Sequence, residues 1–449
     1  MADSCLDLAF PSVKGKVVTA RFDGGDITSD SGLLLLSAAD KKIGLTSSLS
    51  AVIKDNRQSA KVRHKQDTLL AERIFGIGQG YEDTNDFNTL CADPALKLSC
   101  GRAPESDPAL ASQPTLCRFE NRVSKRDLIR MGKALAQCVV KQLPAGTRRV
   151  VLDIDAMEDP CHGQQEFEFF NAFYDSHCFL PLLIYVTDES GRQRLMGVLL
   201  RSGKAGNAGV RWLLRKAVAI LRARFPDLEV VLRADAGFGN DKVLRLCDKL
   251  KLSYILCVSG NRRLHTLSTA IQMQACCKYT FEKASWRYEG GVCREFGTIE
   301  YKAGTWDKKR TVIVKAEITQ GKLNPRFVVT NIDEDNPEKA YAFYCARGDR
   351  ENRIKEFKLD LAGGRTSCHR FLANQFRVLM HAAAAVLIGV IQEAAAGTEW
   401  AKAQAGTIRL RLLKVGARVI ETVRRIWIHM SSSYPNQSAW HTIHQALCT

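Results

Sequence analysis

The sequence predicts an α/β protein with a mixed sheet, preceded and followed in the sequence by helical regions. Short β-branched runs occur between residues 148 and 259, and two of them end in acids. Segments with a helical period alternate with the later runs, which is the pattern of an α/β sheet. Helical patterns dominate residues 1–147 and return at residue 338.

The charge balance favours a polyanionic partner. The chain has 449 residues, which is long for one core and predicts two or three domains. Lys and Arg number 65 against 48 Asp and Glu, so the net charge is +17. An excess of this size favours nucleic acid as the partner. The alternative is a basic protein without such a partner.

Several features favour a cytoplasmic protein with no membrane partner. The N-terminus "MADSCLDLAF" lacks the basic start of a secretory signal. The apolar run at 382–391 is too short to cross a bilayer, so it predicts a buried helix. The 15 cysteines are odd in number and include no C-x-x-C pair, which indicates reduced thiols.

Residues 1–147 are predicted to form a helical domain. "TSDSGLLLLSAADKK" places N-cap residues before an apolar run, and "SKRDLIRMGKALAQCVVKQL" keeps a helical period until Pro144. Between them lies the basic stretch "KDNRQSAKVRHKQ". Basic residues on a helical domain favour DNA binding, although no helix-turn-helix signature is clear.

Residues 148–259 are predicted to form the first part of the sheet. The first strand runs from Val150 to Asp155, and the others lie in "FLPLLIYVTD", "RLMGVLLRSG", "DLEVVLRADAGFGN" and "SYILCVSGN". The helices between the later strands are "NAGVRWLLRKAVAILRARF" and "KVLRLCDKLKL". Apolar runs bounded by turn residues are typical of buried strands.

The remaining chain divides into three segments. Residues 260–337 are predicted as an antiparallel β insertion, with strands in "KYTFEKASWRYEG", "REFGTIEYKAG", "KRTVIVKAEIT" and "PRFVVTNID". Residues 338–395 are predicted to be helical, and 396–449 to be a basic helical region. Seven Lys or Arg residues lie within 401–430, either on a solvated face or in contact with DNA phosphates.

Acidic residues end two of the predicted strands. Asp153 and Asp155 end the first, and Asp235 ends the other. Mg²⁺ prefers oxygen ligands, and two such ions support phosphodiester chemistry. Each acid alone is also an ordinary turn or cap residue. The spacing does not separate Asp153 from Asp155, because both lie on one face of the strand.

A second candidate feature is the segment "YCARGDRENRIKEFK". Its spacings predict one helical stripe. The members of the stripe are Tyr344, Arg347, Glu351, Lys355 and Lys358. Such a stripe is either a row of surface ion pairs or the wall of an active site. In the second case Glu351 is a candidate for the third carboxylate. The segment "HGQQE" at 162–166 is interpreted as a structural hydrogen-bond network in preference to a metal site.

These motifs resemble those of bacterial DDE transposases. Tyr344, Arg347, Glu351 and Lys358 fit the signature Y-x2-R-x3-E-x6-K of one large group. "VVLDIDAMEDPCHGQQE" and "VVLRADAGF" are similar to the two Asp-bearing strands of the insertion sequence 1380 family. Met157 stands where that family usually has Thr.

The resemblance implies an RNase H-like catalytic core interrupted by a β insertion. It implies that Asp155, Asp235 and Glu351 are catalytic and hold two Mg²⁺ ions, with Mn²⁺ as a substitute. Asp155 is preferred to Asp153 because it has the family's "DIDA" position. Residues that would hold the DNA backbone are Tyr344, Arg347 and Lys358.

The implied activity is metal-dependent cleavage of an element's ends and their joining to target DNA. The implied partners are terminal inverted repeats, target DNA and a second copy of the chain in the active complex. The expected location is the bacterial cytoplasm, on the nucleoid when the protein is bound to DNA. Two alternatives stay open, a structure-specific nuclease without joining and a DNA-binding protein derived from a transposase.

Overall fold

The computed structural model describes residues 7–284 and 292–449, which form parts of two compact units. The terminal unit comprises residues 1–127, 359–365 and 383–449. The sheet unit comprises residues 128–358 and 366–382. Contacts therefore group segments from distant parts of the chain. The five consecutive domains expected from the sequence stay a prediction.

The sheet unit is built on an eight-stranded mixed sheet with the order β12-β13-β14-β11-β10-β4-β8-β9. β10 runs parallel to its neighbours β4 and β11, and the other pairs are antiparallel. The strands are β4 (Arg149–Ala156), β8 (Leu182–Thr187), β9 (Gln193–Leu199), β10 (Glu229–Ala234), β11 (Ser253–Val258), β12 (Cys293–Tyr301), β13 (Arg310–Thr319) and β14 (Lys322–Thr330). A small sheet adds β5 (Asp159–Pro160), β6 (Phe169–Asn171) and β7 (Ser176–Phe179). The mixed α/β class is thus as predicted.

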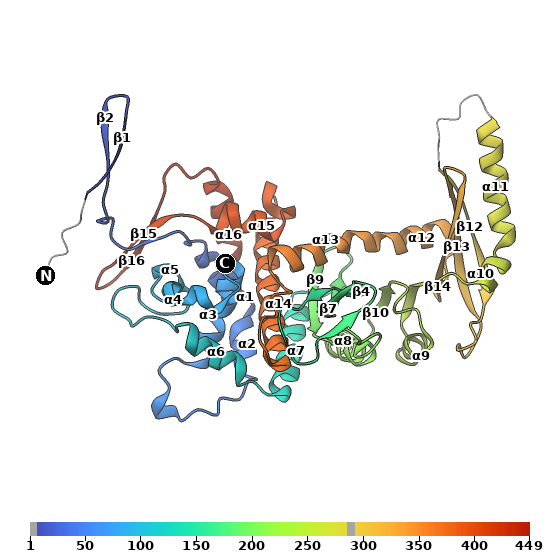
Figure 1. The fold of residues 1–449 in the computed structure, drawn as a ribbon, viewed down its shortest axis with the longest axis horizontal. Coiled ribbons are helices and arrows are strands. Elements are labelled where there is room, and N and C mark those ends of the chain that lie inside the picture. The colour runs from blue at the N-terminus through green and yellow to red at the C-terminus, as the bar shows by residue number, and fades with distance from the viewer. Residues whose placement is uncertain (1–6, 285–291) are drawn as a thin grey trace. The chain divides into compact units, whose positions relative to one another are not determined.

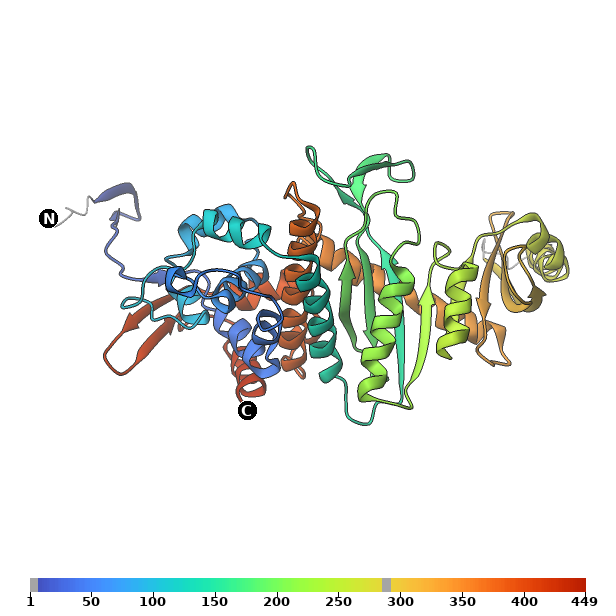
Figure 2. The ribbon, with the colours of Figure 1, turned by 90° about the horizontal axis from the view of Figure 1, so that it is seen from below.

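Helices cover both faces of this sheet. α8 (Val210–Arg224) and α9 (Asp241–Leu250) lie on one face, and α12 (Pro337–Cys345) and α13 (Asp349–Lys355) cross the other (Figures 1 and 2). Burial on both faces explains the nearly unbroken apolar runs of the central strands. α7 (Lys125–Lys141) precedes β4 in the chain.

The strands within residues 260–337 extend the central sheet. One of the strands predicted in this segment is wrong. The strands β12 to β14 join β11 in the same sheet. α10 (Arg262–Leu267) and α11 (Thr269–Ala284) occupy the first part, including most of the described part of the expected strand "KYTFEKASWRYEG". α11 packs Ala275 against Ala316 and Ile318 of β13, so tertiary packing selects the helix. Trp286 lies outside the described residues.

The expected single helical stripe is interrupted. α12 ends at Cys345, a 3-10 turn covers Ala346–Gly348, α13 follows, and a π-helical turn covers Glu356–Asp360. The residues per turn change at each junction, so a constant three-and-four spacing no longer defines one face.

The terminal unit is mainly helical, but it also contains strands. Its helices are α1 (Leu33–Ile43), α2 (Leu45–Ser50), α3 (Gln66–Gln79), α4 (Phe87–Leu90), α5 (Pro94–Ser99), α6 (Gln113–Asn121), α15 (Ala405–Ile408) and α16 (Gln437–Cys448). Short 3-10 or π turns cover Ser59–Lys61, Thr84–Asp86, Glu399–Lys402 and Arg409–Leu413. A separate hairpin consists of β1 (Leu8–Val13) and β2 (Lys16–Ala20).

The region at 396–449, which was expected to be helical, contains strands as well as the helices α15 and α16. β15 (Ala417–Glu421) and β16 (Ile426–Met430) form a hairpin there, and β15 also pairs with β3 (Ile27–Thr28). In β15, Ala417 and Val419 are buried whereas Arg418 is exposed. This alternation has the period of a strand.

The predicted buried helix belongs to α14 (Phe371–Ala394), which is longer than the expected apolar run. In the described part of the chain, α14 is the helix long and apolar enough to cross a membrane. Of its apolar 18-residue window, 83% is buried inside the protein. Such burial is typical of a core helix.

Candidate active site

Asp155 and Asp235 lie side by side where the neighbouring strands β4 and β10 of the central sheet end. β4 and β10 are parallel, and their register pairs Ile154 with Ala234. Asp155 comes directly after Ile154 and Asp235 directly after Ala234, so the two carboxylates lie at the carboxyl ends of neighbouring strands. The Asp235 carboxylate also accepts a hydrogen bond of 2.9 Å from Gly237 N–H, which holds it against the turn that follows β10.

The surroundings of Asp155 shift its pKa upward. Burial raises the pKa of Asp155 to about 6, the charge of Arg347 lowers it, and the charge of Asp235 raises it. Two carboxylates that share a site repel each other when both are ionised, and a bound cation relieves that repulsion. This pair therefore has the electrostatic character of a cation-binding site.

Asp153 is committed to a different partner. Its Oδ1 accepts a hydrogen bond of 2.8 Å from Arg233 Nε, and both side chains are less than 5% exposed. Arg233 faces Asp153 in the β4–β10 register. Arg233 also donates to the carbonyl of Phe343 in α12. Asp153 thus helps to hold α12 on the sheet.

Arg347 lies among the predicted acids. Its guanidinium contacts Asp155 Oδ2 at 2.6 Å and approaches Glu351 Oε1 to 3.8 Å. The charge of Asp235 also acts on it. Arg347 lies in the 3-10 turn that follows α12. Its positive charge partly offsets the negative charges of Asp155 and Asp235.

Glu351 is not gathered with the two aspartates. Its side chain is 71% exposed. Within residues 7–284 and 292–449 there is no group of three or more His, Cys, Asp or Glu residues placed to hold a metal ion. The carboxylate oxygens of Asp155 and Asp235 nevertheless fit a hard divalent cation by their chemistry. The three-acid metal set stays a prediction.

Tyr344 and Lys358 occupy different surroundings. Tyr344 is half-buried beside Tyr341, and burial raises the pKa of its phenol above the usual value. Lys358 lies on the π-helical turn, with its Nζ 3.5 Å from Glu158 Oε2. Lys355 is exposed. Tyr344 therefore lies beside Arg347, which contacts Asp155, whereas Lys358 contacts the segment that follows β4.

The "HGQQE" segment makes structural contacts, as favoured from the sequence. Gln165 Nε2 donates to the carbonyl of Thr366 at 2.6 Å, and the carbonyl of Gln164 contacts His369 Nδ1 at 3.0 Å. The carboxylate of Glu166 accepts from the first N–H of α14, on Phe371. This segment anchors the start of α14.

Sequence reasoning missed two residues that define these surroundings. Arg233 neutralises Asp153, and Glu158 pairs with Lys358. The signal for Arg233 was a lone cation inside the apolar run "VVLRADA". A buried strand seldom carries an unpaired charge, so that residue pointed to an acid on a neighbouring strand.

Paired carboxylates at the carboxyl ends of adjacent parallel strands, beside an arginine, define a class of site suited to phosphate chemistry. The family described as Transposase DDE domain group 1 matches residues 10–449, so the chain belongs to this family of DDE transposases.

Similarity to individual known proteins is low. Its structure is similar to a cryo-EM structure of the piggyBac transposase synaptic complex with hairpin DNA. The identity is 12% and the TM-score is 0.45, over 86% of this chain and 80% of that chain. A similarity of this size does not bear on function. No curated protein matches the sequence significantly.

Proposed function

We propose that the protein is the transposase of an insertion sequence, of the insertion sequence 1380 type, with an RNase H-like catalytic core. The observation that carries the proposal is the pairing of Asp155 with Asp235 at neighbouring strand ends, with Arg347 beside them. Membership of a DDE transposase family supports the same reading.

In this proposal Asp155, Asp235 and Glu351 hold Mg²⁺, or Mn²⁺ in its place. The ions, when bound, supply activation of the attacking oxygen and stabilisation of the leaving oxygen. The burial and mutual repulsion of the two aspartates make cation binding favourable, because both must ionise together to act. Glu351 lies in the turn of helix that follows Arg347, and its exposed carboxylate is free of close packing.

Arg347 has the role of holding the scissile phosphate. Its forked N–H groups match two phosphate oxygens. Arg347 donates to Asp155 Oδ2, so its guanidinium is directed at the acid pair. Tyr344 and Lys358 would contact the DNA backbone on either side of this point.

The proposed reaction has two steps. Water attacks a phosphodiester at the element's end, and the P–O bond to the neighbouring nucleotide breaks to free a 3′-hydroxyl. That hydroxyl then attacks a phosphodiester of the target, forms the new P–O bond and displaces a target 3′-oxygen. The DNA ends are terminal inverted repeats, and a homodimer would hold the two ends in the bacterial cytoplasm.

The test uses a labelled duplex made from the sequence that flanks the gene, with Mg²⁺. Wild-type protein should cut it, and Asp155→Asn, Asp235→Asn and Glu351→Gln should each abolish cutting while retaining DNA binding. Each change keeps the side chain's shape and removes the charge that holds the cation. A variant that cuts at the wild-type rate removes its residue from the site.

A further inference from the structure

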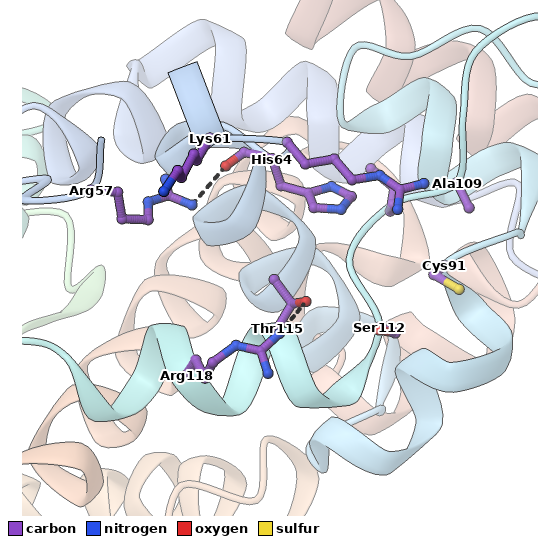
Figure 3. Close-up of a pocket in the computed structure, with 10 residues that line it drawn as sticks. Arg57, Lys61, His64, Cys91, Ala109, Ser112, Thr115 and Arg118 are labelled. Carbon is purple, nitrogen blue, oxygen red and sulfur yellow. Dashed lines mark hydrogen bonds between the residues drawn. The ribbon is translucent and has the colours of Figure 1, made fainter. Parts of the chain in front are cut away.

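A basic cavity lies in the terminal unit, apart from the residues discussed so far. Its volume is about 560 Å³. The residues that line it come from the segment before α3, from the end of α4, from the loop between α5 and α6, and from α6 with its N-cap (Figure 3). They are Arg57, Lys61, Arg63, His64, Cys91, Ala109, Leu110, Ser112, Thr115 and Arg118.

The lining carries four cations and no carboxylate. Arg57 is balanced by Asp55, with Nη2 2.7 Å from Oδ2. For Lys61, Arg63 and Arg118, no ion pair occurs among the residues that the structure describes, and all three are exposed. Three uncompensated positive charges around one hollow repel one another, and an anion between them removes that repulsion.

Two of the basic groups are held in place. Arg57 donates from Nη1 to the carbonyl of His64 at 3.0 Å, and Arg118 donates from Nη2 to Thr115 Oγ1 at 3.2 Å. Figure 3 shows Arg118 on one side of the hollow, and Lys61 and His64 on the other. Burial and the charges of the surrounding arginines lower the pKa of His64. The wall of the cavity is therefore positively charged.

The start of α6 adds to the same field. Ser112 is the N-cap of this nine-residue helix, and both Ser112 and Thr115 line the cavity. The positive end of the α6 dipole favours anions at this point. The first N–H groups of α6 are already engaged, because Gln113 N–H donates to Asn88 Oδ1, Thr115 N–H donates to the carbonyl of Ser112, and Pro114 has none. The helix start therefore adds its dipole, and the cations of the lining supply the donors.

We propose that this cavity binds phosphate groups of the DNA backbone, and so anchors the element's end on the terminal unit. The inference rests on the proposed function for the presence of DNA. Lys and Arg side chains supply donors suited to phosphate oxygens and read no base sequence. The lining has no Phe, Tyr or Trp on which a free nucleotide's base could stack. A backbone phosphate thus fits better than a nucleotide.

The experiment measures duplex binding by fluorescence anisotropy at several salt concentrations. Lys61→Ala, Arg63→Ala and Arg118→Ala should each weaken binding of the flanking duplex and of an unrelated duplex by the same factor. Each should also lower the magnitude of the log–log salt slope by about 0.9, and the triple variant by roughly three times as much. Lys61→Arg keeps the charge and should bind like wild type.

Lys41→Ala is the matched control, because it removes an exposed lysine of the same unit outside this cavity. Circular dichroism melting verifies that each variant is folded. Variants that bind both duplexes as tightly as wild type would overturn the inference and leave the proposed function standing. Wild-type protein that binds no duplex would instead overturn the proposed function, and the inference with it.

A second arm distinguishes the source of the phosphate. Inorganic phosphate is titrated against wild-type protein and the triple variant, by calorimetry. On the proposal, DNA affinity depends on the three cations and inorganic phosphate competes weakly with the duplex. Tight binding of inorganic phosphate that the triple variant loses, with duplex affinity unchanged, would assign the cavity to free phosphate and overturn the DNA assignment.

Discussion

Asp153 and Asp155 are two residues apart on one strand face, yet their surroundings give them different roles. Asp153 forms a buried ion pair with Arg233, whereas Asp155 shares its site with Asp235 and Arg347. Strand spacing predicted the face but did not separate the two acids, and only the family resemblance favoured Asp155. The spacing could not decide because the difference depends on which side chain the neighbouring strand brings alongside. The register that pairs Asp153 with Arg233 supplies that information.

The two aspartates should therefore respond differently to the same change. Asp153→Asn leaves Arg233 buried without its counter-charge and should lower the free energy of unfolding by about 3–5 kcal/mol. Asp155→Asn should leave stability near the wild-type value, because burial already disfavours its charge, and should abolish cleavage. Urea unfolding and the cleavage assay measure the two effects. Asp155→Asn with a large stability loss and intact cleavage would reverse the assignment.

Substitutions at Arg347, Lys358 and Lys355 should have different effects on the protein. Arg347→Lys should impair cleavage, since lysine lacks the fork that contacts Asp155 and would hold a phosphate. Lys358→Ala should weaken binding of cut ends more than it slows cleavage. Lys355→Ala is the control, because its side chain is exposed, and should change stability by no more than roughly 0.5 kcal/mol. Equal effects of Lys355→Ala and Lys358→Ala would show that the signature spacing has no special role.

At the scale of elements, the turn between β10 and α9 positions Asp235. Asn240 caps α9 by accepting from Val243 N–H at 3.3 Å, and the turn closes directly after the strand. A Cβ at Gly239 would lie 2.3 Å from the carbonyl oxygen of Cys257 on β11. The turn therefore depends on a glycine to pack its backbone against the neighbouring strand.

Gly239→Ala should force this turn away from β11 and displace Asp235. We expect a loss of about 1–3 kcal/mol in stability, the range for overpacking a tight site, together with slower cleavage. Gly304→Ala is the control, because nothing lies within 4 Å of a Cβ there. Thermal unfolding and cleavage rates of both variants test the claim. Wild-type behaviour of Gly239→Ala would show that the turn does not fix the acid.

The errors in element prediction have a common physical origin. The strands of the core were predictable because apolar runs and turn residues are local signals. α11 was missed because its helix is selected by packing against β13, which lies later in the chain. The break between α12 and α13 was missed because the spacing of polar residues in the sequence does not distinguish one continuous helix from two helices joined by a 3-10 turn.

At the scale of the whole molecule, the net charge of +17 is the dominant property. Binding of DNA releases counterions from its phosphates, so affinity should fall steeply as salt rises. If about six phosphates are neutralised, the slope of log affinity against log salt should be near −5. Anisotropy titrations between low and moderate salt give this slope. A flat response would show that the positive charge does not form the binding surface.

The most direct test of the account is strand joining. Wild-type protein is incubated with Mg²⁺, a labelled duplex that carries the element's end, and a supercoiled target plasmid. The account predicts a cut at the end of the element and label covalently joined to the plasmid, with neither product when divalent cations are chelated. Cutting without joining would indicate a nuclease, and cutting in the absence of divalent cations would contradict the proposed role of Asp155 and Asp235.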